Sequence, residues 1–309
     1  LARKTLTRNL APRTTRTNLQ AGLVLVDKPE GWTSHDVVAR IRRVANTRRV
    51  GHAGTLDPMA TGLLVLGVES ATKLLTFIVG ADKTYEATIR LGASTITDDR
   101  ESEFLEQASA EAIAQIDDES IRAAIANLTG NIEQVPSSVS AIKVDGVRAY
   151  AKVRGGDEVK LKARPVTVSR FEVIGEPRRV DGFIDLDVII DCSSGTYIRA
   201  LARDLGATLR IGGHLTALRR TRVGGYNIDQ ASKLPEVGDE LQVIASVDAA
   251  RAFPVLELTA GQVIDLRHGK RIPNENGLSG DISAIHDNQL IAVLTPAGKQ
   301  LKSQVVFND

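Results

Sequence analysis

One loop of the sequence combines an acidic side chain with an unusual backbone. It runs Gly51-His-Ala-Gly-Thr-Leu-Asp57-Pro-Met-Ala-Thr-Gly62, so that three glycines surround a single carboxylate. Glycine permits positive φ angles and close approach of a second chain, and Pro58 biases Asp57 toward an extended conformation. A carboxylate on such a loop can reach outward to a substrate and act as a nucleophile or remove a proton. Composition alone favours a plainer alternative, an Asp-Pro turn whose carboxylate is satisfied within the protein.

The elements beside this loop are predicted from the spacing of apolar residues. Residues 22–26 form a short apolar run that is typical of a strand. Thr33 and Asp36 have the spacing of a capping box, and the apolar residues after them recur at helical spacing. Residues 63–68 predict a second strand. The loop is therefore expected between an arginine-rich helix and a strand.

The rest of the chain alternates between helical and strand patterns. Apolar and polar residues alternate from Tyr85 to Leu91, as in a half-buried strand, and Asp145-Gly146 is a strong signal for a hairpin turn. Because strands occur in hairpins as well as between helices, we predict an α+β fold with a mixed sheet. Further helices are expected at 70–80, 121–128 and 196–209, and further strands at 138–144, 166–174 and 182–191.

Length and composition limit the domain organisation and the cellular setting. The 309 residues suffice for a large domain and a small one, which we place at 21–250 and 255–309. Residues 1–20 are basic and predict a disordered tail or, alternatively, an arm that touches RNA. The single cysteine, Cys192, excludes an internal disulfide and a cysteine-rich zinc site. No apolar run reaches the ~18 residues of a membrane span and no signal-peptide core is present, so we expect a cytoplasmic protein.

The charged residues are grouped, although the net charge is only +1. Five arginines lie between positions 40 and 49, and three more lie between positions 219 and 222. Such clusters either form a solvated face or bind nucleic-acid phosphates. The stretch 98–119 is mostly acidic, and we expect it to be a solvent-facing insertion with no site.

The loop 51–62 resembles the signature loop of the bacterial tRNA pseudouridine-55 synthases, the TruB family of pseudouridine synthases. The resemblance implies a pseudouridine synthase fold, with a mixed, largely antiparallel central sheet flanked by helices, and a small β-rich C-terminal domain of the PUA type. Residues 258–272 are similar to the opening of that domain, whereas the remainder is short and poor in aromatic residues, which implies a reduced form. Four further blocks carry the resemblance in the family's order: Gly22-Leu-Val-Leu-Val-Asp-Lys28-Pro-Glu-Gly-Trp-Thr-Ser34, Asp82-Lys-Thr-Tyr85, Cys192-Ser-Ser-Gly195-Thr-Tyr197-Ile-Arg199 and Gly213-His214-Leu-Thr-Ala-Leu218-Arg219-Arg220.

The resemblance implies roles for three catalytic residues. Asp57 would be the nucleophile, Arg199 its charge partner, and Tyr85 the aromatic ring that stacks on the target uracil. An arginine beside a carboxylate favours its charged form and holds it by fork-like hydrogen bonds. From the residues alone, Arg199 could equally form a structural salt bridge, and Tyr85 could be a buried strand residue.

The resemblance also implies residues that bind the RNA. Leu218 resembles the family's apolar contact to the base, Tyr197 is a further substrate-binding residue, and His52 resembles the residue that wedges among displaced T-loop bases. A loop histidine is otherwise more often a surface or capping residue. Phosphates would be bound by the cationic residues Lys28, Arg40, Arg42, Arg43, Arg219 and Arg220.

The implied reaction converts uridine-55 in the T loop of tRNA to pseudouridine. It breaks the N1–C1′ bond, turns the uracil and rejoins it through C5 without net redox change or hydrolysis, so neither a cofactor nor a metal is expected. The carboxylate could attack ribose C1′ or uracil C6, or it could remove a proton to give a glycal-like intermediate, and the sequence leaves these routes open. Extruding the base costs a few kcal/mol, and stacking on an aromatic ring returns about 1–3 kcal/mol.

Two other functions stay open on the sequence. A guide-RNA-dependent uridine isomerase shares the catalytic loop but works within a larger particle, and a non-catalytic tRNA-binding or folding protein would use Asp57 only structurally. The flanking blocks favour a stand-alone enzyme, expected to be a monomer that binds the T-arm stem-loop without an obligatory protein partner. One cysteine excludes a zinc deaminase, and the lack of phosphate-loop and dinucleotide motifs disfavours nucleotide hydrolysis and dinucleotide binding.

Overall fold

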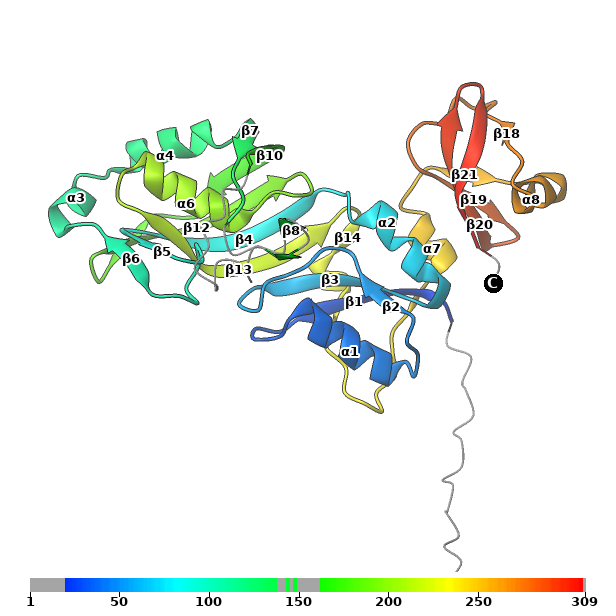
Figure 1. The fold of residues 1–309 in the computed structure, drawn as a ribbon, viewed down its shortest axis with the longest axis horizontal. Helices are drawn as coiled ribbons and strands as arrows, with labels where there is room; N and C mark the ends of the chain where they lie inside the picture. The colour runs from blue at the N-terminus through cyan, green and yellow to red at the C-terminus, as the bar shows by residue number, and fades with distance from the viewer. Residues whose placement is uncertain (1–19, 138–142, 145–146, 149–161, 308–309) are drawn as a thin grey trace, which may run out of the picture.

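A twelve-stranded sheet forms the centre of the computed structural model, which describes residues 20–137, 143–144, 147–148 and 162–307 (Figure 1). Its main path runs β15-β1-β3-β13-β4-β12-β10-β7. Along this path β1–β15 and β3–β13 pair in parallel and the other neighbours are antiparallel, which confirms the α+β fold with a mixed, largely antiparallel sheet. The strands are β1 (Gly22–Lys28), β3 (Thr61–Val68), β4 (Lys83–Leu91), β7 (Gly130–Gln134), β10 (Arg164–Val173), β12 (Phe183–Cys192), β13 (Gly213–Val223) and β15 (Ser232–Lys233), with β2 (Val50–His52), β11 (Arg178–Val180), β14 (Tyr226–Asn227) and β16 (Ile244–Ala245) attached at the side.

The central sheet consists of two halves that meet at one narrow contact, which we call the β3–β13 joint. At this joint Arg219 pairs with Thr61 and Arg220 pairs with Gly62, whereas β13 pairs with β4 along its whole length. Helices α4 (Asp118–Asn127) and α6 (Ile198–Thr208) pack on the β4 half, and α1 (Ser34–Val44) packs on β1 and β3 (Figure 1). The apolar side chains under α6 and those under α1 form two separate clusters, so each half has its own core.

The helix that precedes the loop begins where the sequence predicts. Thr33 is its N-cap, and the capping box with Asp36 is complete: the Asp36 amide donates to Thr33 Oγ1 over 3.1 Å, and the Thr33 amide donates to Asp36 Oδ2 over 3.0 Å. Val37 and Ile41 are fully buried against β1 and β3, as their spacing requires. None of the helices in the described part of the chain is long and apolar enough to cross a membrane.

Other predicted elements are present with shifted boundaries. The strands predicted at 166–174 and 182–191 are β10 and β12, whereas the helix predicted at 70–80 is a 3₁₀ turn, η1 (Glu69–Lys73), followed by the short α2 (Leu75–Ile78). The strand predicted at 138–144 and the turn at 145–146 fall largely outside the described residues. The remaining elements of the large part are β5 (Ala93–Thr95), β6 (Phe104–Gln107), α3 (Ala110–Ala114), β8 (Lys143–Val144), β9 (Val147–Arg148), η2 (Ile228–Gln230) and α7 (Ser246–Ala250).

The acidic stretch 98–119 is exposed or half-buried over most of its length, as its composition suggests, but its first two acids are not. The Asp98 and Asp99 side chains are buried, and Ile113 in α3 belongs to the core under α6. The prediction was wrong for Asp98 and Asp99, because these two acids face arginines of α6 and not solvent.

The C-terminal segment forms a separate five-stranded sheet, which confirms the predicted small β-rich unit. Its strand order is β17-β19-β20-β21-β18, and α8 (Ala260–Arg267) packs beside it. Ile285, Val293 and Phe307 of this unit share an apolar cluster with Leu23 of β1 and Leu74, so the small sheet is attached through a common core. Its strands are β17 (Val255–Glu257), β18 (Ile272–Pro273), β19 (Ile282–His286), β20 (Gln289–Ala297) and β21 (Gln300–Val306).

The shared cluster predicts that the small sheet and the large part unfold together. Phe307 is 2% exposed and lies under the Lys73 ammonium, 5.4 Å from the ring centre. We expect Phe307→Ala to lower the free energy of unfolding by about 3 kcal/mol, because a buried aromatic side chain leaves a cavity. Chemical denaturation followed by fluorescence and circular dichroism should still show one transition. A control variant at the 61% exposed Leu105, Leu105→Ala, should change little, and an early separate transition in Phe307→Ala would contradict the common core.

Candidate active site

The loop that carries Asp57 is held between β2 and β3, which pair antiparallel on either side of it. Gly62 allows the loop to meet β13: its φ is +101°, and a Cβ there would lie 2.3 Å from the Arg220 carbonyl oxygen. A side chain at this position would therefore push the two strands apart. The loop is also fixed to α1, because Ser34 Oγ accepts from the Leu56 amide over 2.8 Å and donates to the Leu56 carbonyl over 3.1 Å.

Two fully buried cations hold the loop from inside. The Lys28 ammonium donates to the carbonyls of Pro29 (3.0 Å), Trp32 (2.6 Å) and Pro58 (3.3 Å). The Arg220 guanidinium donates to the carbonyls of Leu63 (2.8 Å), Gly54 (3.1 Å) and Thr55 (3.5 Å). Lys28 is 0% and Arg220 is 1% exposed, so neither side chain can reach an RNA phosphate. The prediction that both bind phosphates was therefore wrong. Their charges instead satisfy carbonyl groups of an irregular backbone that is shut off from water.

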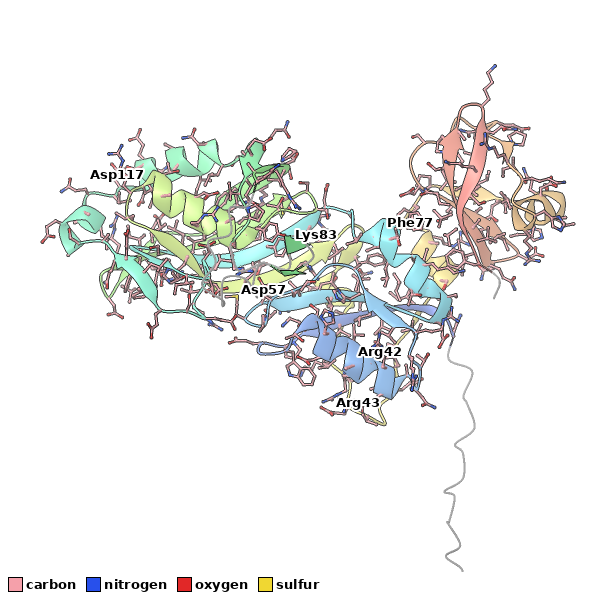
Figure 2. The ribbon with its side chains drawn as sticks, viewed as in Figure 1. Arg42, Arg43, Asp57, Phe77, Lys83 and Asp117 are labelled. Carbon is pink, nitrogen blue, oxygen red and sulfur yellow. The ribbon has the colours of Figure 1, made fainter. Side chains whose placement is uncertain are left out.

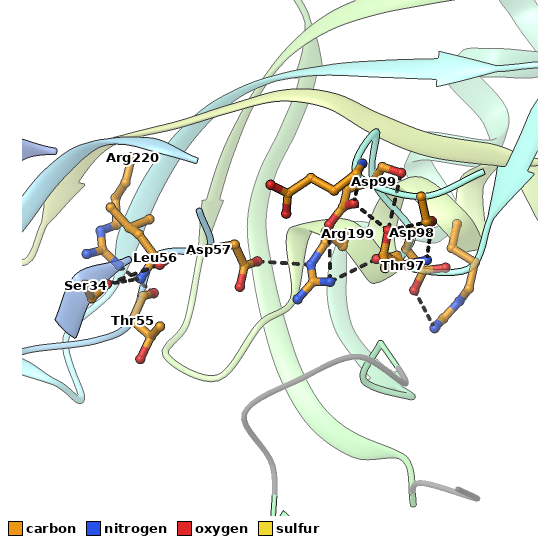
Figure 3. A network of polar contacts seen from close by, with 12 residues as sticks. Ser34, Thr55, Leu56, Asp57, Thr97, Asp98, Asp99, Arg199 and Arg220 are labelled. Carbon is orange, nitrogen blue, oxygen red and sulfur yellow. Dashed lines mark hydrogen bonds and ion pairs between the residues drawn. The ribbon is translucent and has the colours of Figure 1, made fainter. Parts of the chain in front are cut away.

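Asp57 faces an ion-pair network that begins at Arg199 (Figure 3). Arg199 Nε lies 3.0 Å from Asp57 Oδ2, and Arg199 Nη1 lies 3.3 Å from Asp99 Oδ2 and donates to the Thr97 carbonyl over 2.9 Å. The Arg199 and Asp99 side chains are 7% and 2% exposed, whereas that of Asp57 is 36% exposed. The guanidinium is thus fixed from behind, and the carboxylate it holds is the one that solvent can reach.

The residues around Asp57 enclose a cavity of about 260 Å³. Of the residues singled out in the sequence, the cavity brings together Asp57, Tyr85, Tyr197, Arg199, Leu218 and Arg220. Tyr85 is buried on β4, and burial raises the pKa of its hydroxyl, so it stays a neutral ring at neutral pH. Burial also raises the pKa of the Tyr197 hydroxyl. The cavity therefore offers aromatic and apolar walls around a single exposed carboxylate.

Lys83 also lines the cavity, although its position in the sequence predicted no role for it. Its ammonium donates to the carbonyls of Val79 (3.0 Å) and Ala81 (2.5 Å), and it is 6% exposed. Burial, and then the neighbouring Arg220, lower the pKa of Lys83 to about 8. Figure 2 shows Lys83 and Asp57 in the middle of the large part, near where the two half-sheets meet. The sequence signal that points to Lys83 is its position directly before Thr84 and Tyr85, in one of the blocks that carry the resemblance to the family.

The structure places His52 outside the lining of this cavity, at the end of β2. Its ring is half-buried and meets the His35 ring edge-on, with 5.7 Å between the ring centres. Burial lowers the pKa of His52, with a smaller contribution from the charge of His35. The neutral form is therefore favoured at neutral pH.

The four remaining cationic residues do not share one environment. Arg219 is 38% exposed and makes a two-pronged ion pair with Asp27, at 2.8 and 3.0 Å. Arg40 lies over the Trp32 ring at 5.0 Å and pairs with Glu236. Arg42 and Arg43 are exposed on the outer side of α1 (Figure 2). Of the six cationic residues predicted to bind phosphates, only Arg42 and Arg43 are highly exposed, and both lie on the outer side of α1.

Comparison with known proteins assigns the chain to one family. The description "TruB family pseudouridylate synthase (N terminal domain)" matches residues 42–198, "tRNA pseudouridylate synthase B C-terminal domain" matches 199–257, and "tRNA Pseudouridine synthase II, C terminal" matches 253–308. A relative from Arthrobacter sp. named tRNA pseudouridine synthase B is 56% identical over 298 residues, which cover 93% of this chain and 96% of the relative. The chain belongs to the TruB family of pseudouridylate synthases.

Other comparisons agree with membership of the TruB family. A second relative with the same name, from Leifsonia xyli, is 57% identical over 292 residues, with 93% of this chain and 96% of the relative covered. A chain in the crystal structure of a Cbf5–Nop10–Gar1 complex has a TM-score of 0.69 at 23% identity, with 93% of this chain and 85% of that chain covered. At that identity the likeness shows the fold alone. The resemblance of the sequence to the TruB family is confirmed, and the match at 253–308 covers the small β-rich sheet.

Arg199 is expected to be irreplaceable by lysine. A single ammonium cannot span Asp57, Asp99 and the Thr97 carbonyl, because it lacks the planar fork of the guanidinium. We expect Arg199→Lys to lower kcat for the family's isomerisation by about 100-fold or more, in line with the loss of a positioned charge at a reacting centre. Arg203→Lys, on the next turn of α6 and paired with Asp98 and Asp204, is the matched control and should retain most activity. Equal activity of the two variants would contradict the network.

The buried Lys28 predicts a particular dependence of stability on pH. Burial lowers its pKa from 10.5 to about 8, so between these values the unfolded chain holds a proton that the folded chain has lost. The contribution of Lys28 to the free energy of unfolding therefore rises with pH above 8, by up to about 1 kcal/mol per pH unit. Denaturant titrations at pH 8.0, 8.75 and 9.5 should show a shallower rise for Lys28→Met than for wild type. A variant of the exposed Lys233, Lys233→Met, should keep the wild-type slope; an unchanged slope in Lys28→Met would contradict this assignment.

Proposed function

We propose that this chain is a stand-alone enzyme that converts uridine-55 in the T loop of tRNA to pseudouridine. The observation that carries the proposal is the single exposed carboxylate of Asp57, held by Arg199 at a cavity walled by Tyr85 and Leu218. The relatives named tRNA pseudouridine synthase B support the substrate, since they cover nearly the whole chain at 56–57% identity. A cavity of about 260 Å³ lies just below the range of about 300–1,000 Å³ for drug-sized ligands and suits one extruded nucleotide.

The proposed reaction uses the cavity residues in distinct ways. The target uridine leaves the RNA stack and its uracil lies against the Tyr85 ring, with Leu218 as an apolar contact. Asp57 meets the nucleotide at the base–sugar linkage, either as a nucleophile at C1′ or C6 or as the base that starts a glycal route. The N1–C1′ bond breaks, the C5–C1′ bond forms, the C5 proton leaves to water and N1 gains a proton, so the atoms balance without a cofactor.

Arg199 would keep the carboxylate in place during this sequence. Because Asp99 and the Thr97 carbonyl fix the guanidinium, its distance to Asp57 does not depend on the substrate. Preorganised charge of this kind lowers the barrier without reorganisation during the reaction. The alternative of a purely structural Asp57 does not explain why this acid is the exposed member of the network.

RNA binding would involve a smaller set of cations than the sequence suggests. Arg42 and Arg43 are the members of the predicted set best placed to contact phosphates, and Arg219 and Arg40 are engaged by acids. The small C-terminal sheet would add contacts to the tRNA beyond the T loop. Removing residues 255–309 is not a clean test of that role, because it would uncover the apolar cluster shared with β1.

The enzyme would work alone, as a cytoplasmic monomer without a guide RNA. The support is the name of the relatives, tRNA pseudouridine synthase B, which this chain matches over 96% of their length. A guide-dependent isomerase and a non-catalytic tRNA-binding protein are the alternatives. Purified protein mixed with a T-arm RNA and nothing else separates the three.

The decisive measurement is the release of tritium from a T-arm RNA labelled at uracil C5. Isomerisation must transfer that tritium to water, whereas binding alone cannot. Wild-type protein should release it without added RNA or protein, and Asp57→Asn and Asp57→Ala should be inactive while they bind the RNA as tightly as wild type. Turnover by either variant would reject Asp57 as the catalytic carboxylate, and the lack of release by wild type would reject the enzyme.

A further inference from the structure

The start of α6 is held by a side chain from a distant strand. Gln134 is the last residue of β7 and is 1% exposed. Its Nε2 donates to the Tyr197 carbonyl over 3.1 Å, and its Oε1 accepts from the Tyr197 amide over 2.8 Å. One carboxamide therefore binds both backbone groups of a single residue, 63 positions away in the chain.

The chemistry of the two bonds fixes the carboxamide in one orientation. A backbone N–H can only donate and a carbonyl can only accept, so the oxygen of Gln134 must face the Tyr197 amide and its nitrogen the carbonyl. Neither glutamate nor leucine can reproduce this pair, because glutamate lacks the donor and leucine lacks both groups. Asparagine has the right groups but a side chain shorter by one methylene.

Tyr197 needs such a partner because it is an unusual N-cap. Helix α6 begins after it, and Tyr197 makes no side-chain hydrogen bond to the first turn. Serine, threonine, asparagine and aspartate normally fill this role with their own oxygen atoms. The carbonyl of Tyr197 already accepts from the Leu201 amide over 3.2 Å, and Gln134 occupies its second acceptor position. The backbone at the entrance of the helix is thereby fixed from outside.

The residues that follow are those that face Asp57. Tyr197, Ile198 and Arg199 all line the cavity, whereas Gln134 does not. A rotation of the chain at Tyr197 would move its ring and would shift the Arg199 guanidinium relative to Asp57, 3.0 Å away. We propose that Gln134 is a positioning residue for the isomerisation, which acts on the reacting centre through the backbone of Tyr197; this inference rests on the proposed function.

Single-turnover tritium release at saturating enzyme tests the inference. Gln134→Leu should lower the rate constant by about 10- to 100-fold, since small displacements of a positioning group have effects of that size, while its Kd for T-arm RNA stays that of wild type. Gln134→Asn keeps both hydrogen-bonding groups on a side chain shorter by one methylene and should lie between Gln134→Leu and wild type. Glu133→Ala is the matched control, because Glu133 is the preceding residue of β7 and is exposed; it should react at the wild-type rate.

A double-mutant cycle separates positioning from a general loss of stability. If Gln134 acts by placing the Arg199 guanidinium, the variant that combines Gln134→Leu with Arg199→Lys should be slowed less than the product of the two single effects. A strictly multiplicative loss would overturn the inference, as would a wild-type rate constant in Gln134→Leu. It would also be overturned if Gln134→Leu lost RNA affinity and thermal stability while bound RNA reacted at the wild-type rate. Absence of tritium release by wild type would instead refute the proposed function itself and this inference with it.

Discussion

The geometry of the site depends on one guanidinium shared by two carboxylates. Arg199 is almost completely buried, and a buried cation is tolerated only when its charge and its donors are matched. Asp99 and the Thr97 carbonyl supply that match from one side, so the position of the guanidinium is set before any substrate arrives. Asp57 completes the arrangement from the other side and remains accessible. The network explains how a flexible-looking loop residue acquires a defined position.

A second constraint concerns the backbone of the loop itself. The carbonyls of Gly54, Thr55 and Pro58 in this loop accept hydrogen bonds from the charged ends of Arg220 and Lys28. A charged donor forms stronger hydrogen bonds than a neutral one, and a long side chain can reach several carbonyls at once. Burying Lys28 still has a cost, which shows in its lowered pKa. Residues that look like an RNA-binding surface in the sequence are therefore part of the scaffold.

The sequence predicted the elements that have a strong local pattern. The capping box at Thr33, the alternation after Tyr85 and the amphipathic spacing of α6 all appear in the structure, because each is decided by residues close together in the chain. The same holds for the loop 51–62, whose glycines and proline predict its shape. The resemblance then brought Tyr85, Arg199 and the other cavity residues into one hypothesis, and the structure brings them together in space.

What the sequence could not show depends on contacts between distant segments. Asp99 is read as one more acid in an acidic run until it is seen beside Arg199, 100 positions away. Gln134 and Lys83 are ordinary polar residues until the backbone groups they bind are known. Whether an arginine is exposed, as Arg43 is, or buried, as Arg220 is, follows from how its helix or strand packs in the fold and not from its neighbours in the chain. Exposure was accordingly the property predicted least well.

The β3–β13 joint divides the residues of the site between the two half-sheets. Asp57 belongs to the half-sheet with α1, whereas Arg199, Tyr85 and Leu218 belong to the half-sheet with α6, and the strands that link them share two residue pairs. The loop nevertheless crosses this seam, because Leu56, Met59 and Ala60 beside Asp57 pack into the apolar cluster under α6 and not into the one under α1. One half-sheet carries the acid while the neighbours of that acid pack against the other half, so the 3.0 Å contact between Asp57 and Arg199 does not depend on the two strand pairs alone.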